Sequence, residues 1–291
     1  MDRLGVIGGS GLYAVEGIED AREDVIETPW GAPSDAILTG RLAGREMAFL
    51  PRHGRGHALS PSDVPYRANI AALKMLGCRE VVALSACGSF REEMAPGHFV
   101  ILDQFIDRTR DRAASFFGKG CVAHVSLAHP TCARLGDAVE AAAGTAGITA
   151  HRGGTYLAME GPQFSTLAES RMFRDTLGAD VIGMTNMPEA KLAREAELPY
   201  ATLGMVTDYD CWHPDHGNVE VEKVLAVLKA NAATAAQTVV ELTKLLGAKA
   251  RTPSPDGIET CLDFAIITSP DAQDPEKATQ LSAILKRWAS R

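Results

Sequence analysis

Short apolar runs separated by longer amphipathic segments recur along this chain. Runs of strand length occur at residues 4–7, 81–84, 155–159 and 180–183. A fifth run, residues 200–206, is followed within four residues by two acidic residues, Asp208 and Asp210. Apolar runs of about four to eight residues that are bounded by turn residues are typical of buried strands. The pattern therefore predicts β-strands at these positions.

Helical periodicity is clearest near the end of the chain. Between residues 219 and 246, apolar side chains recur at steps of three and four, as on one face of an α-helix. These positions are Val221, Val224, Leu225, Leu228, Ala232, Ala235, Val239, Leu242 and Leu246. Asn218 is a suitable N-cap for this helix. A shorter helix is predicted over residues 63–76, with Asp63 as its N-cap.

Strands that alternate with helices predict an α/β fold with a mixed central sheet flanked by helices. The chain has 291 residues and shows no repeat or long linker, so we expect one domain over residues 1–291. The segment of about residues 251–291 opens with a proline-containing loop and is expected to be a helical tail. Its helix, residues 275–288, is expected to pack on the body or on a neighbouring subunit.

Composition and charge exclude several classes of function. The formal net charge is −8, which argues against nucleic acid or anionic membranes as partners. No apolar run approaches the roughly 20 residues of a membrane span, and the N-terminus does not resemble a signal peptide. Neither the six cysteines nor the histidines show metal-site spacing. We therefore expect a cytoplasmic protein that binds no metal.

A glycine-rich loop follows the first predicted strand. Residues 9–14 match G-x-G-x-x-A, but the segment after them contains Gly17, Pro29, Gly31 and Pro33 and has no helical period. A dinucleotide site requires a helix there, so the match does not indicate NAD. Glycines let the backbone approach a ligand closely, and Ser10 adds a hydroxyl. A phosphate-binding loop and a simple tight turn are both consistent with this segment.

Residues 52–57, Arg-His-Gly-Arg-Gly-His, place four potential cations after a predicted strand in an otherwise acidic chain. Arginine binds phosphate through its planar fork of N–H donors. Hydroxyl groups follow other predicted strands at Ser10, Ser85 and Thr185. Together they would make a phosphate cradle, and the alternative is a solvated polar loop.

Asp208 and Asp210 come directly after the buried strand predicted over residues 200–206. In open α/β sheets, ligands bind at the carboxyl ends of strands. Two carboxylates there can bind an amino group or give a proton to a ring nitrogen, although they also suit a solvated turn. Phe164 is suited to stacking on a planar base, with core packing as the alternative.

Seven motifs occur in the order found in one known family. They are residues 8–11 (GGSG), 52–54 (RHG), 85–89 (SACGS), 103–109 (DQFIDRT), 160–162 (EGP), 183–189 (GMTNMPE) and 207–212 (TDYDCW). This set resembles the S-methyl-5′-thioadenosine phosphorylases of the trimeric purine nucleoside phosphorylase family. The resemblance covers about residues 4–246 and implies the nucleoside phosphorylase fold.

The resemblance also implies three groups of side chains in one site. Inorganic phosphate is bound by Ser10, Arg52, His53, Ser85, Ala86 and Thr185. The base lies against Phe164, Ser165, Asp208 and Asp210, and the two acids are catalytic. The ribose and its methylthio group lie against Met184, Val221, Val224, Leu225 and His124, the last contributed by a neighbouring subunit. A homotrimer or a pair of trimers is expected, with phosphate as co-substrate and no cofactor.

The implied reaction is a pentosyl transfer, the phosphorolysis of S-methyl-5′-thioadenosine to adenine and 5-methylthioribose-1-phosphate in purine and methionine salvage. The acid pair favours a 6-aminopurine, because an ionised carboxylate repels the carbonyl of a 6-oxopurine. One alternative is a phosphorylase for methylthioinosine or for 6-oxopurine nucleosides in general. An alternative of another class is a protein that binds nucleosides without catalysis.

Overall fold

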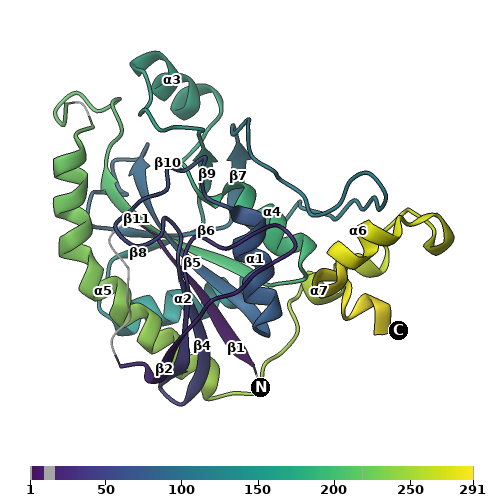
Figure 1. The fold of residues 1–291 in the computed structure, drawn as a ribbon. Helices are drawn as coiled ribbons and strands as arrows, with labels where there is room; N and C mark the ends of the chain where they lie inside the picture. Colours follow the sequence, from purple (N-terminus) through teal and green to yellow (C-terminus); the bar gives the residue numbers. More distant parts are fainter. Residues whose placement is uncertain (1, 10–16, 218, 291) are drawn as a thin grey trace.

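The computed structural model describes residues 2–9, 17–217 and 219–290. Within these residues, eleven strands form one sheet (Figure 1). They are β1 (Arg3–Gly8), β2 (Glu19–Asp24), β3 (Ile37–Leu42), β4 (Arg45–Pro51), β5 (Cys78–Ser89), β6 (Phe99–Leu102), β7 (Gln104–Asp107), β8 (Ala150–Arg152), β9 (Thr155–Ala158), β10 (Val181–Gly183) and β11 (Tyr200–Asp208). The sheet is mixed, because β1 is parallel to β4 and β5 while β10 is antiparallel to β5.

Helices cover both faces of this sheet (Figure 1). The α-helices are α1 (Tyr66–Met75), α2 (Ala133–Thr145), α3 (Leu167–Arg171), α4 (Asn186–Glu195), α5 (Val221–Gly247), α6 (Pro275–Gln280) and α7 (Ser282–Leu285). Helices α2 and α5 share one core with the sheet, and α1, α4 and α7 share another on the opposite face. The expected α/β architecture, a mixed sheet flanked by helices, is confirmed.

Strand β5 shows why both faces of the sheet are apolar. Its side chains alternate in direction, so Val81 and Ala83 enter one core while Val82 and Leu84 enter the other. A strand covered on both sides needs apolar residues at every position, which is the run that the sequence shows.

The same strand changes partners along its length. Strand β1 pairs with β5 up to Ala83, and β10 pairs with it only from Gly88 onward. The intervening residues of β5 keep β11 on their other side. Ser85 and Ala86 therefore lie where one edge of β5 has no strand partner among the described residues. A change of strand partner of this kind is where α/β sheets commonly open to ligands.

Two predicted helix starts are wrong. Helix α1 begins at Tyr66 behind Pro65, and no side chain caps it. Asp63 instead lies in a turn, where its N–H donates to Ser60 O. The reason is that a proline disfavours helical backbone in the residue before it, so the helix cannot extend back through Val64. Helix α5 has Glu220 as its N-cap residue, and Asn218 lies outside the described residues.

The tail also differs from its predicted single helix over residues 275–288. Helices α6 and α7 are separated at Leu281, and a 3-10 turn, Trp288–Ser290, follows. Leu281 and Ile284 are fully buried in the core that contains α1, so the tail packs on the body (Figure 1). Among the described residues, no helix combines the length and the apolar character that crossing a lipid bilayer demands.

Candidate functional site

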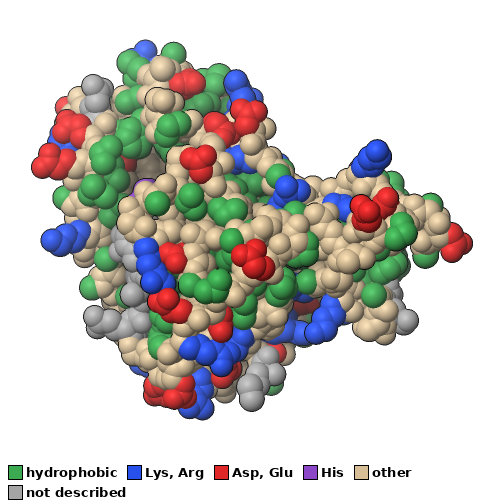
Figure 2. Space-filling view, in the orientation of Figure 1, with side chains coloured by type: hydrophobic (Ala, Val, Ile, Leu, Met, Phe, Trp, Pro, Cys, Tyr) green, Lys and Arg blue, Asp and Glu red, His purple; other side chains and the backbone are tan. Residues whose placement is uncertain are grey.

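A cavity of about 670 Å³ opens beside the partner change of β5. It lies between the ends of β5 and β11, the loops after β4 and β9, and the first turns of α5. The predicted site residues that line it are Arg52, His53, Ser85, Ala86, Phe164, Met184, Thr185, Asp208, Asp210, Val221, Val224 and Leu225. Figure 2 shows a hollow on this face of the molecule, with apolar side chains gathered along its rim.

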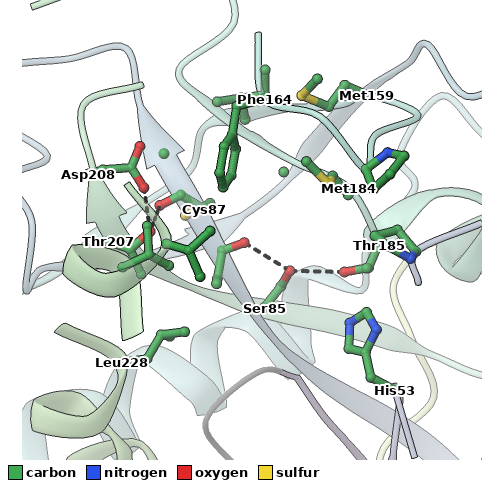
Figure 3. A pocket seen from close by; sticks show the side chains of 18 of the residues that line it. His53, Ser85, Cys87, Met159, Phe164, Met184, Thr185, Thr207, Asp208 and Leu228 are labelled. Carbon is green, nitrogen blue, oxygen red and sulfur yellow. Dashed lines mark hydrogen bonds between the residues drawn. The ribbon is translucent and has the colours of Figure 1, made fainter. Parts of the chain in front are cut away.

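The acid corner, Asp208 and Asp210, lies on one side of this cavity. The Asp210 N–H donates to Asp208 Oδ1 at 2.8 Å. The Thr207 hydroxyl lies 2.6 Å from Asp208 Oδ2 (Figure 3). Asp210 has φ 49°, a left-handed conformation that is uncommon outside glycine and that turns the chain back at this point. A Cβ at Gly88 would lie 2.7 Å from Asp208 Oδ1, so any larger residue there would displace the Asp208 carboxyl group.

Both carboxyl groups of the acid corner are more difficult to ionise than usual. Burial raises the pKa of Asp208 above 3.8, although the Thr207 hydroxyl and the Asp210 N–H oppose the shift. Burial also raises the pKa of Asp210, and the neighbouring Asp208 charge adds to this effect. Within the described residues neither acid forms an ion pair with Lys or Arg. A buried carboxyl group without a cation favours its protonated form.

The arginine corner, comprising Arg52, His53, Ser85 and Thr185, lies across the cavity from the acids. Ser85 Oγ and Thr185 Oγ1 are 3.1 Å apart, which links the interior of β5 to the loop after β10 (Figure 3). Ser10 lies outside the described residues.

His53 is held as a neutral imidazole. Its Nδ1 lies 3.0 Å from Leu59 O, so Nδ1 carries the proton and donates. Burial and the adjacent Arg52 charge lower the pKa of His53 to about 4. At neutral pH this side chain therefore contributes hydrogen bonding rather than charge.

Arg52 is fully buried, and its charge is balanced within the protein. Its Nε and Nη2 donate to the two carboxylate oxygens of Glu189 at 2.7 and 2.9 Å. Its Nη1 donates to Leu84 O at 2.9 Å. Burial opposes the charge of Arg52, but the Glu189 carboxylate outweighs burial and raises the pKa of Arg52.

The four potential cations of residues 52–57 do not form one cationic pocket. Arg55 points into solvent and pairs with Glu23 and Asp35. His57 lines the cavity but stacks on His53, with ring centroids 4.3 Å apart, and burial lowers its pKa. The sequence showed the positive side chains but not the acids that neutralise them.

An apolar wall completes the cavity. Val221, Val224 and Leu225 come from consecutive turns of α5, and Leu228 extends the same stripe. Phe164 lies at the opposite side with 43 % of its surface exposed, so it is not a core residue (Figure 3). Such a wall favours an apolar substituent over a hydroxyl group.

The chain that forms this cavity is similar to known proteins over nearly its whole length. The model of the phosphorylase superfamily matches residues 3–244. The S-methyl-5′-thioadenosine phosphorylase of Cereibacter sphaeroides is 61% identical over 284 residues, covering 98% of this chain and 97% of that protein. The chain belongs to the phosphorylase superfamily.

Another relative and two solved structures agree with this family. The S-methyl-5′-thioadenosine phosphorylase of Rhodospirillum rubrum is 59% identical over 287 residues, covering 98% of this chain and 96% of that protein. The crystal structure of a methylthioadenosine phosphorylase from an antarctic soil metagenomic library has a TM-score of 0.91 at 47% identity, covering 98% of this chain and 99% of that one. The methylthioadenosine phosphorylase of Schistosoma mansoni, in complex with adenine, has a TM-score of 0.83 at 33% identity, covering 94% and 99%. The expected resemblance is confirmed.

Two predicted site residues of this protein, Ser165 and His124, do not line its cavity. Ser165 lies just behind it, with its hydroxyl 3.8 Å from Met159 Sδ. His124 lies near the tail, where its backbone N–H donates to Ala265 O at 2.9 Å. Its contribution to a neighbouring subunit's site stays a prediction.

Sequence reasoning missed Glu189 and Tyr200, which lie behind the arginine corner. The available signal in the sequence was an acidic residue within the segment that forms helix α4. In the structure Glu189 is only 1 % exposed. A charged group in a buried helix requires a partner, and Arg52 is that partner.

Among the described residues, no group of His, Cys, Asp and Glu side chains is arranged to hold a metal ion.

Proposed function

We propose that this protein is an S-methyl-5′-thioadenosine phosphorylase, which converts S-methyl-5′-thioadenosine and phosphate to adenine and 5-methylthioribose-1-phosphate. One observation carries the proposal: the acid corner and the arginine corner line the same cavity of about 670 Å³. A pentosyl transfer to phosphate needs a group that assists the departing base and a group that holds the incoming phosphate at one sugar carbon.

Asp208 serves as the general acid toward the base. Its raised pKa supports a protonated carboxyl group that gives its proton to N7 of the purine. The bond between C1′ and N9 then breaks, and its electron pair moves onto the base. Asp210 accepts hydrogen bonds from the 6-amino group. Phe164, which projects into the cavity, stacks on the ring.

Phosphate binds at the arginine corner and captures the sugar. The remaining N–H groups of Arg52 and the hydroxyls of Ser85 and Thr185 hold it, and Ser10 and the backbone of Ala86 complete the set. Phosphate stabilises the positive charge that develops at C1′, and one of its oxygens forms the new bond. Met184 lies under the ribose.

The rest of the cavity supports the choice of substrate. Carboxyl groups beside the base favour a 6-aminopurine over a 6-oxopurine. The apolar side chains Val221, Val224 and Leu225 favour a methylthio group over a 5′-hydroxyl, which would lose its hydrogen bonds to water there.

The test is release of free base from S-methyl-5′-thioadenosine, S-methyl-5′-thioinosine and inosine, each with and without phosphate. We expect phosphate-dependent release that is fastest with S-methyl-5′-thioadenosine. A preference for inosine would favour a 6-oxopurine enzyme instead. Nucleoside that binds without release of base in the presence of phosphate would indicate a non-catalytic binding protein.

The functional unit is proposed to be a homotrimer, alone or as a pair of trimers, in which His124 enters a neighbouring site near the 5′ end of the nucleoside. Phe264 and Ile267 support this proposal, because they are 95 % and 65 % exposed beside the segment that carries His124. Large exposed apolar side chains of this kind favour burial against another subunit.

Mixing subunits tests the shared site. We expect inactive Asp208→Asn chains and impaired His124→Ala chains to regain activity when they are refolded together, since some sites then receive both intact residues. A monomeric mass in light scattering, or no recovery in the mixture, contradicts a shared site.

The six free cysteines, four of them buried, support a reducing, cytoplasmic location.

A further inference from the structure

Glu189 and its hydrogen-bond partner Tyr200 stand directly behind the arginine corner, outside the cavity. We propose that Glu189 is a positioning residue for phosphate, which acts by fixing the plane of the Arg52 guanidinium. The proposal deepens the proposed function and rests on it, since it assigns the phosphate half of the reaction to a residue that does not contact phosphate.

The geometry leaves Arg52 one orientation. Glu189 takes Nε and Nη2 through two nearly equal bonds, 2.7 and 2.9 Å, which is the bidentate arrangement that fixes a guanidinium plane. Leu84 O takes one hydrogen of Nη1. A Cβ at Gly9 would lie 2.9 Å from Nη1, so any larger residue there would displace the guanidinium.

The donors of Arg52 are then divided between the protein and the cavity. Arginine carries five N–H donors, of which Glu189 uses two and Leu84 uses one. One N–H remains on Nη1 and one on Nη2. Because Arg52 lines the cavity, the proposal assigns these two remaining donors to an anion there.

Tyr200 holds Glu189 in turn. The Tyr200 hydroxyl donates to Glu189 Oε1 at 2.8 Å, and both side chains are only 1 % exposed. Tyr200 begins β11, the strand that ends at Asp208. The buried hydrogen bond therefore joins the support of the arginine corner to the strand that carries the acid corner.

Glu189→Gln is the most direct test, because it keeps the shape of the side chain. The glutamine amide has one donor end, so it faces an N–H of Arg52 with another donor and turns the guanidinium out of its plane. We expect the KM for phosphate to rise about 10- to 100-fold, the equivalent of one charge-assisted hydrogen bond. The KM for the nucleoside should stay within about threefold of the wild-type value.

A matched control separates positioning from loss of fold. Glu80 is equally buried and bridges Arg45 and Arg134, each at 2.7 Å, away from the cavity. Glu80→Gln should lower the melting temperature but leave the KM for phosphate unchanged. Equal rises of this KM in both variants would overturn the proposal.

Two milder variants still test the proposal if Glu189→Gln does not fold. Tyr200→Phe removes one hydrogen bond from Glu189 without changing charge, and should raise the KM for phosphate about 2- to 10-fold. Glu189→Asp restores the charge at shorter reach and should recover part of the loss. An unchanged phosphate KM in folded Tyr200→Phe contradicts the inference.

Calorimetry with inorganic phosphate alone distinguishes the two proposals. If the wild-type protein releases no base, the proposed function fails, but weaker phosphate binding in Glu189→Gln than in Glu80→Gln still supports the positioning role. If the wild-type protein is active and both variants bind phosphate equally well, only the role of Glu189 fails.

Discussion

The acid corner and the arginine corner face the same cavity, but each avoids a buried net charge in a different way. Asp208 and Asp210 have no cationic partner among the described residues, and burial raises the pKa of each carboxyl group. Arg52 keeps its charge because Glu189 lies 2.7 Å away. In the first corner burial shifts the acids toward their protonated forms, and in the second an ion pair balances the charge.

The difference fits the two tasks. A group that must give up a proton needs a pKa that the surroundings raise, which burial without a partner provides. A group that must hold an anion in a fixed place needs permanent charge and rigid geometry, which a bidentate arginine pair provides. The four predictions below perturb one corner while leaving the other intact.

The largest effect is expected from Asp208→Asn. An amide cannot supply a proton to N7, so kcat should fall about 10²- to 10⁴-fold. Thermal unfolding should stay close to that of the wild type, and phosphate binding in calorimetry should be unchanged. In the wild type, the rate should fall as pH rises through the elevated pKa of Asp208. Full turnover of the variant would contradict the role assigned to Asp208.

Arg52→Met should instead act on stability. It leaves the Glu189 carboxylate buried without its cation, which should lower the free energy of unfolding by about 3–5 kcal/mol in urea titrations. The control is Arg55→Met, which removes an exposed pair with Glu23 and should cost about 1 kcal/mol or less. Similar losses of unfolding free energy in the two variants would show that the buried Arg52 pair contributes no more to stability than the exposed Arg55 pair.

Ser85→Ala should have a moderate effect that is confined to phosphate. The hydroxyl lies 3.1 Å from that of Thr185, and losing one neutral hydrogen bond should raise the KM for phosphate about 2- to 10-fold. The KM for the nucleoside should not change. A larger rise in the KM for the nucleoside than in the KM for phosphate would show that Ser85 contacts the sugar or the base instead.

The smallest effect concerns His53 and pH. Its folded pKa, about 4, lies below the usual 6.5, so the unfolded chain binds this proton more readily than the folded one. The contribution of His53 to stability is therefore complete above pH 6.5 and declines as pH falls toward 4. Proton NMR should show a neutral His53 imidazole at pH 6, with His53→Gln identifying the resonance. A midpoint near 6.5 would contradict the buried, neutral state.

Regular patterns in the sequence predicted most of the fold. The strands around residues 81–84 and 200–206 and the long helix α5 have strong local signals, because buried strands are continuously apolar and an exposed helix is apolar on one face. Helix α2 was not predicted, and the tail was predicted as one helix. Breaks such as the one at Leu281 depend on how the tail meets α1 rather than on local periodicity.

The sequence by itself determined which chemical groups this protein has and, for Asp208, Arg52 and Thr185, the strand ends near which they lie. Ser85 was predicted to follow a strand, but β5 continues to Ser89, so Ser85 lies inside it. Asp208, Arg52 and Thr185 could be selected because polar residues at the carboxyl ends of buried strands lie at the sheet edge where ligands bind. Their order along the chain also carried the family resemblance.

Only the tertiary structure decided the charge state of these groups. Glu189 is 137 residues from Arg52 in the chain, yet the two side chains form the buried ion pair. The pKa values of His53 and Asp208 likewise depend on the packing that removes water from them. Electrostatic energies depend on distance in space and on solvent exposure, and neither quantity is encoded in local sequence spacing.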